Sequence, residues 1–294
     1  MHTLGDGPIH IALTFDDDFW APAYATMRSI CVSTQRKRDL VFHLCHQPMT
    51  EEHRADLLKI ESEFGSALRF YDLSKTEHFL DLLGRVPKNK RLGDIPYARF
   101  VMDRFLPAEI ERLIYLDCDM MVVSPIERIW EADLGDKAFA AVEDAWGKLL
   151  AAHHDLRGRG GVLDPADPYF NAGLLVIDMK RWRDFGVAEK LETLINDGTA
   201  AKLSFSQNVL NLIFRNNWQP LDAGWNVTSP KPEHERMGAH LFHYTGHAKP
   251  WKLFARVAFF RLYRHVMTNE LYYRYFRHRV RGRLARYLPF LRAS

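Results

Sequence analysis

The 294-residue chain has few cysteines and no long apolar segment. Its three cysteines, Cys31, Cys45 and Cys118, are odd in number and form no Cys-x-x-Cys pair. This argues against a disulfide framework and a thiolate zinc site, and it is typical of a reducing compartment. No run of eighteen or more apolar residues is present, so we expect no membrane-spanning helix. The first eight residues contain no basic region followed by an apolar one, so we expect no secretory signal.

The glycine-rich sequences that commonly hold nucleotides are also absent. No Gly-x-Gly-x-x-Gly follows the first apolar segment, and no Gly-x-x-x-x-Gly-Lys-Ser/Thr occurs anywhere in the chain. A nucleotide, if one binds, is therefore not held by a dinucleotide-binding turn or by a P-loop.

The charge of the chain is unevenly distributed. The net charge is +3, but residues 252–294 contain eleven Lys/Arg and one acid, which gives this tail a net charge of +10. Residues 1–251 then carry a net charge of −7. The length is enough for one large α/β domain or two small ones, and an acidic body with a basic, aromatic tail calls for an explanation in terms of a partner.

The first part of the chain alternates between apolar strands and helices. Ile9–Phe15, Leu40–His46 and Leu68–Leu73 have the composition of buried strands. The apolar spacing of Pro22–Ser33 predicts a helix, and Thr50 is the predicted N-cap of a second helix that ends at Gly65. This β-α-β-α-β order predicts a parallel, Rossmann-like sheet.

The remaining elements are less regular. We expect a helix that opens at Ile95 and runs to Leu106, an amphipathic helix over Lys180–Asn196, and a helix capped by Ser204–Asn208 that ends at Phe214. The polar segment Lys148–Pro168 is either a loop that acts as a lid or a plain surface excursion. Further strands are expected at Phe139–Val142, Leu174–Met179, Trp218–Leu221 and Ala239–Tyr244.

The segment Arg112–Val123 joins a buried strand to two acidic residues. An apolar run ends in Asp117 and Asp119, which would point to the same face of an extended backbone. Two such carboxylates repel each other unless a positive charge lies between them, and a hard divalent cation is the natural candidate. Ligands of open α/β sheets bind at the carboxyl ends of strands. Asp-x-Asp alone is common in turns and solvated loops, so the rest of the chain must decide.

A second segment offers a nitrogen ligand and two groups suited to phosphate. His243 lies at the end of a predicted strand, and Gly246 and Lys249 follow within six residues. Two carboxylates and one imidazole suit Mn²⁺ or Mg²⁺ that must also hold phosphate oxygens. A glycine lets phosphate approach the backbone, and a lysine supplies a point charge. A lone histidine is more often structural, but the neighbouring Gly and Lys favour a binding role.

Four segments together resemble glycosyltransferase family eight. They are Leu116-Asp117-Cys118-Asp119, Phe170-Asn171-Ala172-Gly173, Gln207-Asn208 and the string His243-Tyr244-Thr245-Gly246-His247-Ala248-Lys249-Pro250-Trp251. The resemblance covers roughly Ile9 to Trp251, and the final string is its most specific part. It implies a GT-A α/β fold and retaining, metal-dependent transfer of galactose or glucose from the UDP-sugar. The implied acceptor is a glycan or glycolipid such as a lipopolysaccharide or lipooligosaccharide core. We therefore expect a catalytic domain over residues 1–251 and a basic α-helical extension over residues 252–294.

The resemblance also implies roles for individual residues. It implies a Mn²⁺ or Mg²⁺ site formed by Asp117, Asp119 and His243, and diphosphate binding by Gly246 and Lys249. The implied contacts to uracil and ribose are Thr14, Phe15, Asp16 and Asp17. The implied contacts to the rest of the donor are Arg99, Cys118, Asp144, Asn171, Ala172 and Gln207, with Gln207 nearest the anomeric carbon.

One position departs from the family pattern in a way that concerns the mechanism. Relatives have an acid directly before the glutamine, and this chain has Ser206. A double displacement needs a carboxylate nucleophile beside the anomeric carbon. Ser206 removes one candidate and favours front-face substitution assisted by Gln207, with Asp144 as the rival nucleophile.

The basic tail has four possible roles. Aromatic and aliphatic residues alternate with arginines over residues 257–283, a pattern typical of helices that lie on anionic membranes. The tail could also hold a phosphorylated glycolipid, bind RNA, or pack as a helical pair on the acidic body. No nucleic-acid motif accompanies it, and the resemblance favours a cytoplasmic enzyme at the inner membrane face.

Two other functions remain open for the chain as a whole. A metal-dependent nucleotidyltransferase would release pyrophosphate, but the chain has no glycine-rich triphosphate loop. A catalytically inactive, glycan- or membrane-binding relative is the second alternative, and the retained aspartates and His243 argue against it.

Overall fold

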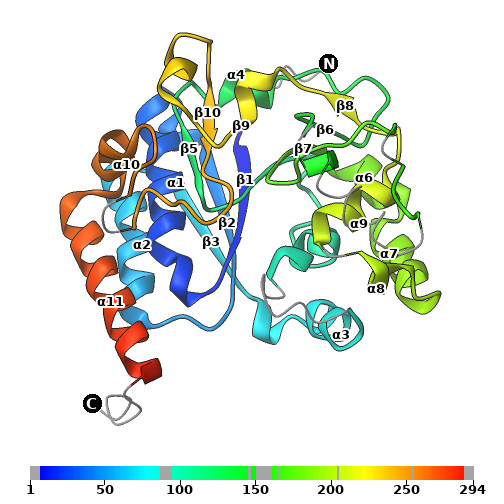
Figure 1. Cartoon of the computed structure of the whole chain (residues 1–294), viewed down its shortest axis with the longest axis horizontal. Helices are drawn as coiled ribbons and strands as arrows, with labels where there is room; N and C mark the ends of the chain where they lie inside the picture. The colour runs from blue at the N-terminus through cyan, green and yellow to red at the C-terminus, as the bar shows by residue number, and fades with distance from the viewer. Residues whose placement is uncertain are drawn as a thin grey trace.

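The computed structural model describes residues 7–86, 95–144, 147–149, 161–164, 166–203, 205–252 and 255–287, with side chains up to residue 284. Its centre is a seven-stranded sheet in the order β3-β2-β1-β4-β7-β6-β8 (Figure 1). The strands are β1 (Ile9–Phe15), β2 (Leu40–His46), β3 (Ala67–Asp72), β4 (Arg112–Leu116), β6 (Phe139–Ala141), β7 (Leu174–Asp178) and β8 (Gln219–Pro220).

The sheet is mostly parallel, as predicted. β1 pairs in parallel with β2 and β4, β2 pairs in parallel with β3, and β6 with β8. β7 is antiparallel to both β4 and β6. The Rossmann-like arrangement therefore covers the first half of the chain, and the direction reverses where β7 joins the sheet.

Local sequence explains the two helices of this first half. α1 (Trp20–Ser33) and α2 (Glu51–Phe64) connect the parallel strands. The Thr50 side chain accepts a hydrogen bond from the His53 backbone N–H, which is the predicted N-cap. Gly65 ends α2 with a φ of 72°, a left-handed conformation that favours glycine.

The helices on the other face of the sheet differ in part from the prediction. They include α3 (Glu77–Arg85), α6 (Met179–Phe185), α7 (Val187–Asn196) and α9 (Ser206–Ile213). The single helix expected over Lys180–Asn196 is wrong, because Gly186 adopts a φ of 68° and separates α6 from α7. The prediction of one helix from Ile95 to Leu106 is also wrong, because this segment forms two 3₁₀ helices, Ile95–Phe100 and Met102–Arg104.

The other short helices lie between these elements. They are α4 (Glu127–Trp130) and α8 (Thr199–Lys202), and the 3₁₀ helices Asp17–Phe19, Lys37–Asp39, Leu73–Lys75, Ala223–Asn226 and Pro232–Glu235. Most of the predicted loop Lys148–Pro168, together with Ser204, lies outside the described residues.

A second sheet forms beside the first. It contains β5 (Met120–Val122), β10 (Leu241–His243) and β9 (Val227–Thr228) in the order β5-β10-β9. β10 is antiparallel to β5 and parallel to β9. The segment Arg112–Val123 is therefore not one extended strand. The chain leaves the large sheet after Leu116 and enters the small sheet at Met120, with a three-residue turn between them.

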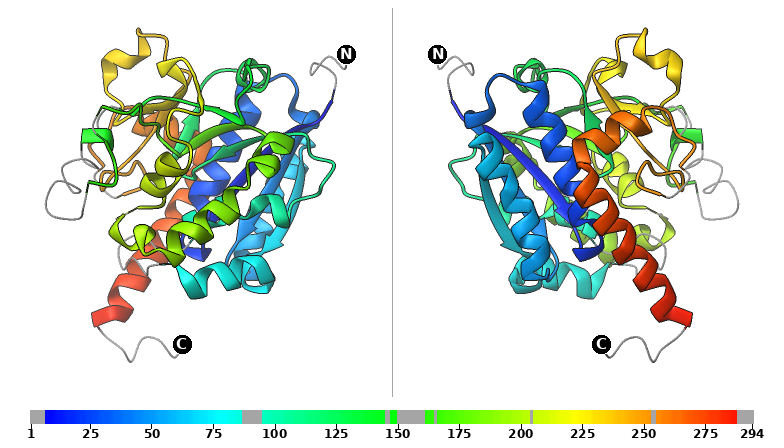
Figure 2. Two further views of the ribbon diagram at one scale, coloured as in Figure 1. Left: turned by 90° about the vertical axis from the view of Figure 1, so that its right-hand side faces the viewer. Right: turned by 90° about the vertical axis from the view of Figure 1, so that its left-hand side faces the viewer.

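The C-terminal segment is helical, as predicted, and it packs on the body. α10 (Phe260–Met267) and α11 (Asn269–Tyr287) lie along α1 and α2 (Figures 1 and 2). The buried side chains of these two helices are Tyr263, Val266, Met267, Leu271 and Tyr275. Arg274 forms ion pairs with Asp56 at 2.7 Å and with Glu52 at 2.5 Å. The basic tail thus neutralises acidic groups of the body.

The opposite side of α11 faces outward. Tyr273, Val280 and Leu284 are exposed, as are Arg277 and Arg281. Their spacing of four, three, one and three residues places them on one helical stripe. We call these five residues the outer stripe. No helix in the described part of the chain is long and apolar enough to cross a bilayer.

Matched substitutions on the inner and outer faces of α11 test how this helix contributes to stability. Tyr275 is 2% exposed and its hydroxyl donates to the Asp18 carbonyl at 2.8 Å, whereas Tyr273 is 52% exposed. Tyr275→Ala should lower the free energy of unfolding by about 3 kcal/mol, because it empties a packed aromatic site. Tyr273→Ala removes an exposed contact with Arg264 and should change this free energy by no more than about 1 kcal/mol. Urea unfolding measures both values, and equal effects would contradict the docking of α11.

Candidate active site

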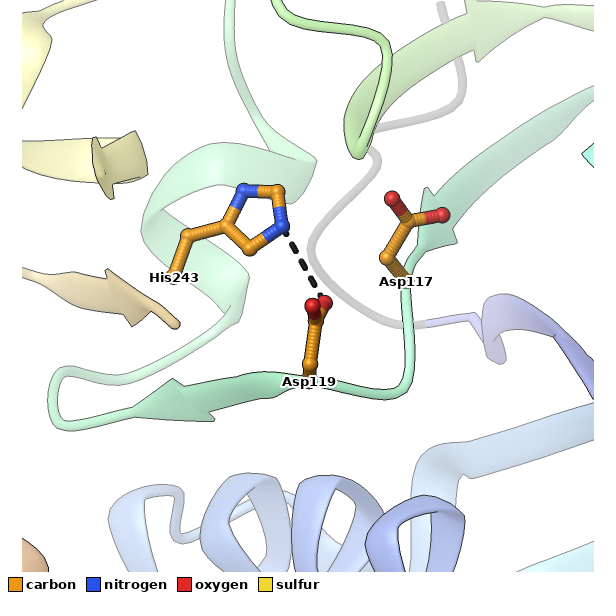
Figure 3. Close-up of side chains that lie close together, drawn as sticks. All are labelled: Asp117, Asp119 and His243. Carbon is orange, nitrogen blue, oxygen red and sulfur yellow. Dashed lines mark ion pairs between the residues drawn. The ribbon is translucent and has the colours of Figure 1, made fainter. Parts of the chain in front are cut away.

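Three predicted ligand side chains converge where the two sheets meet. Asp117 follows β4, Asp119 precedes β5, and His243 is the last residue of β10 (Figure 3). His243 pairs with Met120, and the Tyr244 backbone N–H donates to the Asp119 carbonyl at 3.0 Å. This pairing places the imidazole beside Asp119. One ligand atom from each of the three residues lies within 4.8 Å of the others. The turn and the pairing between strands bring the carboxylates together, not the alternation of an extended strand.

Positive groups surround Asp119. His243 Nε2 lies 3.1 Å from Asp119 Oδ1, and Lys249 Nζ lies 2.5 Å from Asp119 Oδ2. Burial by itself would raise the pKa of the Asp119 carboxyl. The charges and hydrogen bonds of His243 and Lys249 outweigh that effect and hold this pKa well below its usual range. Asp119 is therefore a carboxylate, as a cation ligand must be.

A second set of contacts holds Asp117. Its backbone N–H donates to the Gly173 carbonyl at 2.8 Å. Its Oδ1 atom accepts from Arg99 Nη2 at 3.3 Å and from the Tyr115 hydroxyl at 3.1 Å. Arg99 is buried, lies over the Tyr115 ring at 4.6 Å, and donates to the Ala172 carbonyl. The predicted donor residue Arg99 thus contacts the predicted cation site directly.

Gly173 lies close to these side chains. A Cβ atom on Gly173 would lie 2.6 Å from His243 Cε1, 2.8 Å from Asp117 Oδ2 and 2.8 Å from Met120 Cε. No side chain fits there without displacing a ligand. The glycine of the predicted Asn171-Ala172-Gly173 segment therefore keeps the space between Asp117 and His243 free.

A polar group expected at the donor sugar lies beside the predicted cation ligands. Gln207, in the first turn of α9, donates from Nε2 to Asp144 Oδ2 and to the Tyr169 hydroxyl, both at 3.2 Å. Its Oε1 atom accepts from the Ala172 backbone N–H at 3.1 Å. Asn171 Nδ2 donates to the same Asp144 oxygen at 3.0 Å. The structure thus brings together the residues that the sequence assigned to the sugar.

The predicted nucleoside-binding segment, at the end of β1 and just after it, lies next to this region, and its side chains differ in burial and in their partners. Cys118 Sγ lies 3.6 Å from the Thr14 carbonyl, which ties the segment to the acidic turn. Phe15 is buried in the core, so it can offer a ligand only its backbone. Asp17 Oδ1 lies 2.7 Å from His53 Nδ1, whereas Asp16 is exposed.

Burial decides the protonation of one predicted donor-binding residue, Cys118, and backbone conformation decides the accessibility of another, Gly246. Burial raises the pKa of the Cys118 thiol well above its ordinary value, so this thiol stays neutral and makes no ionic contact. Gly246 has a φ of 72°, a conformation that favours glycine, and nothing lies within 4 Å of its missing side chain. The backbone at Gly246 is therefore open to a ligand.

Three residues of this region were not identified from the sequence. Tyr169 contacts Gln207, Gly147 donates its backbone N–H to Asp144 Oδ1 at 2.7 Å, and Asn226 bonds to both Asn171 and His243. Tyr169 adjoins the Phe170–Gly173 segment, which could have drawn attention to it. Asn226 has no such signal, because its partners are distant in the sequence.

Comparison with known proteins identifies the family. The sequence model described as glycosyl transferase family 8 matches residues 10–255. The chain therefore belongs to glycosyltransferase family 8, and it is a glycosyltransferase. This membership favours glycosyl transfer over the nucleotidyltransferase and inactive-relative alternatives.

Relatives and solved structures agree with this assignment. General stress protein A of Bacillus subtilis (strain 168) is 24% identical over 266 residues, which cover 84% of this chain and 88% of the relative. Probable galacturonosyltransferase-like 3 of Arabidopsis thaliana is 27% identical over 270 residues, covering 85% and 76%. The crystal structure of the galactosyltransferase LgtC with donor and acceptor sugar analogues matches with a TM-score of 0.72 and 20% identity, covering 88% and 95%. The GT-A fold is thus confirmed.

The close approach at Gly173 makes a prediction for stability. Gly173→Ala should lower the free energy of unfolding by about 1–3 kcal/mol, because the added methyl group overlaps His243, Asp117 and Met120. Gly84→Ala is the control, since Gly84 is exposed in α3 with nothing within 4 Å of an added Cβ. That change should raise stability by up to about 1 kcal/mol. Chemical denaturation in metal-free buffer measures both, and a neutral Gly173→Ala would contradict the tight geometry.

Proposed function

We propose that this glycosyltransferase transfers galactose or glucose, with retention, from a UDP-sugar to a glycan or glycolipid acceptor of the lipopolysaccharide-core class. The observation that carries the proposal is the meeting of two groups of side chains. Asp117, Asp119 and His243 can hold a cation, and Asp144 and Gln207 lie beside them as a sugar-binding pair. The name of the similar galactosyltransferase structure supports a hexose donor, and the galacturonosyltransferase-like relative supports a donor sugar of the related hexuronic acid type.

The residues fit a divalent cation. Two carboxylates and one imidazole are the ligand types that Mn²⁺ or Mg²⁺ accepts while leaving positions for phosphate oxygens. Gly173 keeps the space between the ligands free. When bound, the cation would neutralise negative charge that develops on the departing diphosphate.

The chain's own residues add to that effect. Lys249 brings its ammonium group to the same site, and Gly246 offers open backbone for a phosphate. Positive charge that is already in place costs no reorganisation when the sugar–phosphate bond breaks. Asp16, exposed after β1, is the side chain of that segment that remains available for the nucleoside.

The polar pair beside the cation site favours front-face substitution. The acceptor oxygen bonds to the anomeric carbon, the bond from that carbon to the β-phosphate oxygen breaks, and the acceptor proton passes to the departing phosphate. Asp144 accepts hydrogen bonds from Gly147, Asn171 and Gln207. These three bonds use most of the four lone-pair sites of the carboxylate, hold it in place and make it a weaker nucleophile. Ser206 supplies no carboxylate, so Gln207 remains as the polar group that orients the sugar.

The outer stripe supports a peripheral location on the cytoplasmic side of the inner membrane. It combines an aromatic and two aliphatic side chains with Arg277 and Arg281 on an exposed helix face. Such a surface suits the headgroup region of an anionic bilayer. The same arginines would also suit the phosphates of a glycolipid acceptor.

A panel of nucleotide sugars tests the donor and the cation site together. Without acceptor, the enzyme should release UDP from UDP-galactose or UDP-glucose in the presence of Mn²⁺ and much less after chelation. Asp119→Ala should lower this rate by roughly 100-fold or more, because a ligand is lost where charge develops. Release of pyrophosphate from a nucleoside triphosphate and a sugar phosphate would instead indicate a nucleotidyltransferase. No turnover and no metal-dependent UDP binding would indicate an inactive relative.

Liposome sedimentation tests the membrane surface with the full-length chain, because truncation of α10 and α11 would uncover the core. Arg277→Ala combined with Arg281→Ala should weaken binding to vesicles rich in phosphatidylserine by roughly 30-fold, at about 1 kcal/mol per arginine. The control carries Lys231→Ala and Arg236→Ala, which remove two exposed charges outside the C-terminal helices. Equal losses for both pairs would show a nonspecific charge effect and refute the stripe.

A further inference from the structure

Asn226 lies between the cation ligands and the sugar-binding pair. It ends the 3₁₀ helix Ala223–Asn226, just before β9, and its side chain is 5% exposed. Its Oδ1 atom lies 2.9 Å from His243 Nδ1, and its Nδ2 atom lies 2.9 Å from Asn171 Oδ1. Asn171 and His243 are also buried. These contacts make a continuous chain of hydrogen bonds in a dry environment.

A backbone group fixes the direction of this chain. The Gly173 N–H donates to Asn171 Oδ1 at 3.0 Å, and a backbone N–H can only donate. The atom of Asn171 at this point is therefore its carbonyl oxygen, and the Asn226 atom beside it must be the amide nitrogen. The carbonyl oxygen of Asn226 then faces His243, so His243 Nδ1 must be the donor.

The donor-to-acceptor direction of this hydrogen-bond chain decides which ring nitrogen of His243 can bind a cation. Without a cation, a hydrogen on Nε2 accounts for the contact with Asp119. With a cation bound, the ligating imidazole is neutral and carries one hydrogen, so a hydrogen on Nδ1 leaves the Nε2 lone pair for the cation. Nε2 is the atom that faces Asp119 at 3.1 Å. A hydrogen-bond acceptor behind a histidine ligand fixes the ring orientation and raises the basicity of the ligating nitrogen.

The other end of the chain reaches the sugar-binding pair. Asn171 Nδ2 donates to Asp144 Oδ2, which also accepts from Gln207. Both asparagines must accept on one side and donate on the other. An aspartate at either position would replace the donor with a second acceptor.

We propose that Asn226 is a positioning residue that holds His243 with Nε2 directed to the cation site and links this site, through Asn171, to the Asp144–Gln207 pair. The inference rests on the cation site of the proposed function. It goes beyond that function in assigning a role to a residue that is not itself a ligand.

Binding of Mn²⁺ to the full-length protein, followed by the paramagnetic resonance signal of free Mn²⁺, tests the proposal without any substrate. Asn226→Leu keeps the approximate size of the side chain and removes both hydrogen bonds. It should weaken Mn²⁺ binding roughly 10- to 100-fold, the usual range for loss of a partner behind a ligand. Asn226→Asp retains an acceptor for His243 Nδ1 but loses the donor to Asn171 Oδ1, so it should recover only part of the Mn²⁺ affinity that Asn226→Leu loses.

Asn211→Leu is the matched control. Asn211 is also 5% exposed; it accepts from the Phe170 backbone N–H at 2.8 Å and donates to the Phe170 carbonyl at 2.9 Å and to the Gln207 backbone carbonyl at 3.0 Å. Within the described residues, none of these hydrogen bonds reaches Asp117, Asp119 or His243, so loss of the Asn211 amide should reduce stability and leave Mn²⁺ affinity unchanged. Equal weakening by Asn226→Leu and Asn211→Leu, or no rescue by Asn226→Asp, would overturn the proposal.

A measurement on the wild-type protein does not depend on any variant of Asn226 folding. In ¹⁵N-histidine spectra with Mg²⁺ bound, the His243 signals, assigned by their absence in His243→Gln, should show the hydrogen on Nδ1. A hydrogen on Nε2 would overturn the inference. If the wild type binds no Mn²⁺, the proposed cation site fails and the inference fails with it. If it binds Mn²⁺ and Asn226→Leu has no effect, the inference alone fails.

Discussion

Two carboxylates held close together in a partly buried turn must be compensated by positive or hydrogen-bond-donating groups. In this protein Asp117 receives Arg99 and the Tyr115 hydroxyl, and Asp119 receives His243 and Lys249. These partners come from segments far apart in the chain. The pairing of β5 with β10 places Asp119 against His243 where the two sheets meet. The short connection from β4 to β5 keeps Asp117 nearby, in contact with Arg99.

Close packing around Gly173 excludes any larger residue at this position. Gly173 leaves room for Asp117 and His243 where a methyl group would not fit. Its backbone N–H and carbonyl orient Asn171 and Asp117, respectively. The backbone of one glycine therefore controls both the space at the proposed cation site and the direction of the hydrogen-bond chain through Asn226. In a buried environment such a chain is costly to leave half satisfied, which ties the proposed cation ligands and the proposed sugar-binding pair into one unit.

The basic tail has two faces with different physical roles. On the inner face Arg274 pairs with the buried Asp56, and Tyr275 and Leu271 fill apolar space beside α1 and α2. The tail contacts the segment after β1 as well, through Tyr275 and Asp18. The outer stripe carries the exposed aromatic, aliphatic and arginine side chains. Because both faces mix aromatic residues with arginine, the sequence alone could not separate packing on the body from binding to a membrane.

The sequence by itself determined the features that depend on neighbouring residues. The strands Ile9–Phe15 and Leu40–His46 follow from their apolar runs, and the start of α2 follows from Thr50. The candidates Asp117, Asp119 and His243 followed from their residue types at predicted strand ends, and the wider set of donor-binding residues followed from the family resemblance. Tertiary structure decided the rest. The reversal of β7 and the split at Gly186 depend on packing and backbone conformation. The role of Asn226 depends on partners 55 and 17 residues away, and no local pattern encodes a hydrogen bond that exists only after the two sheets meet.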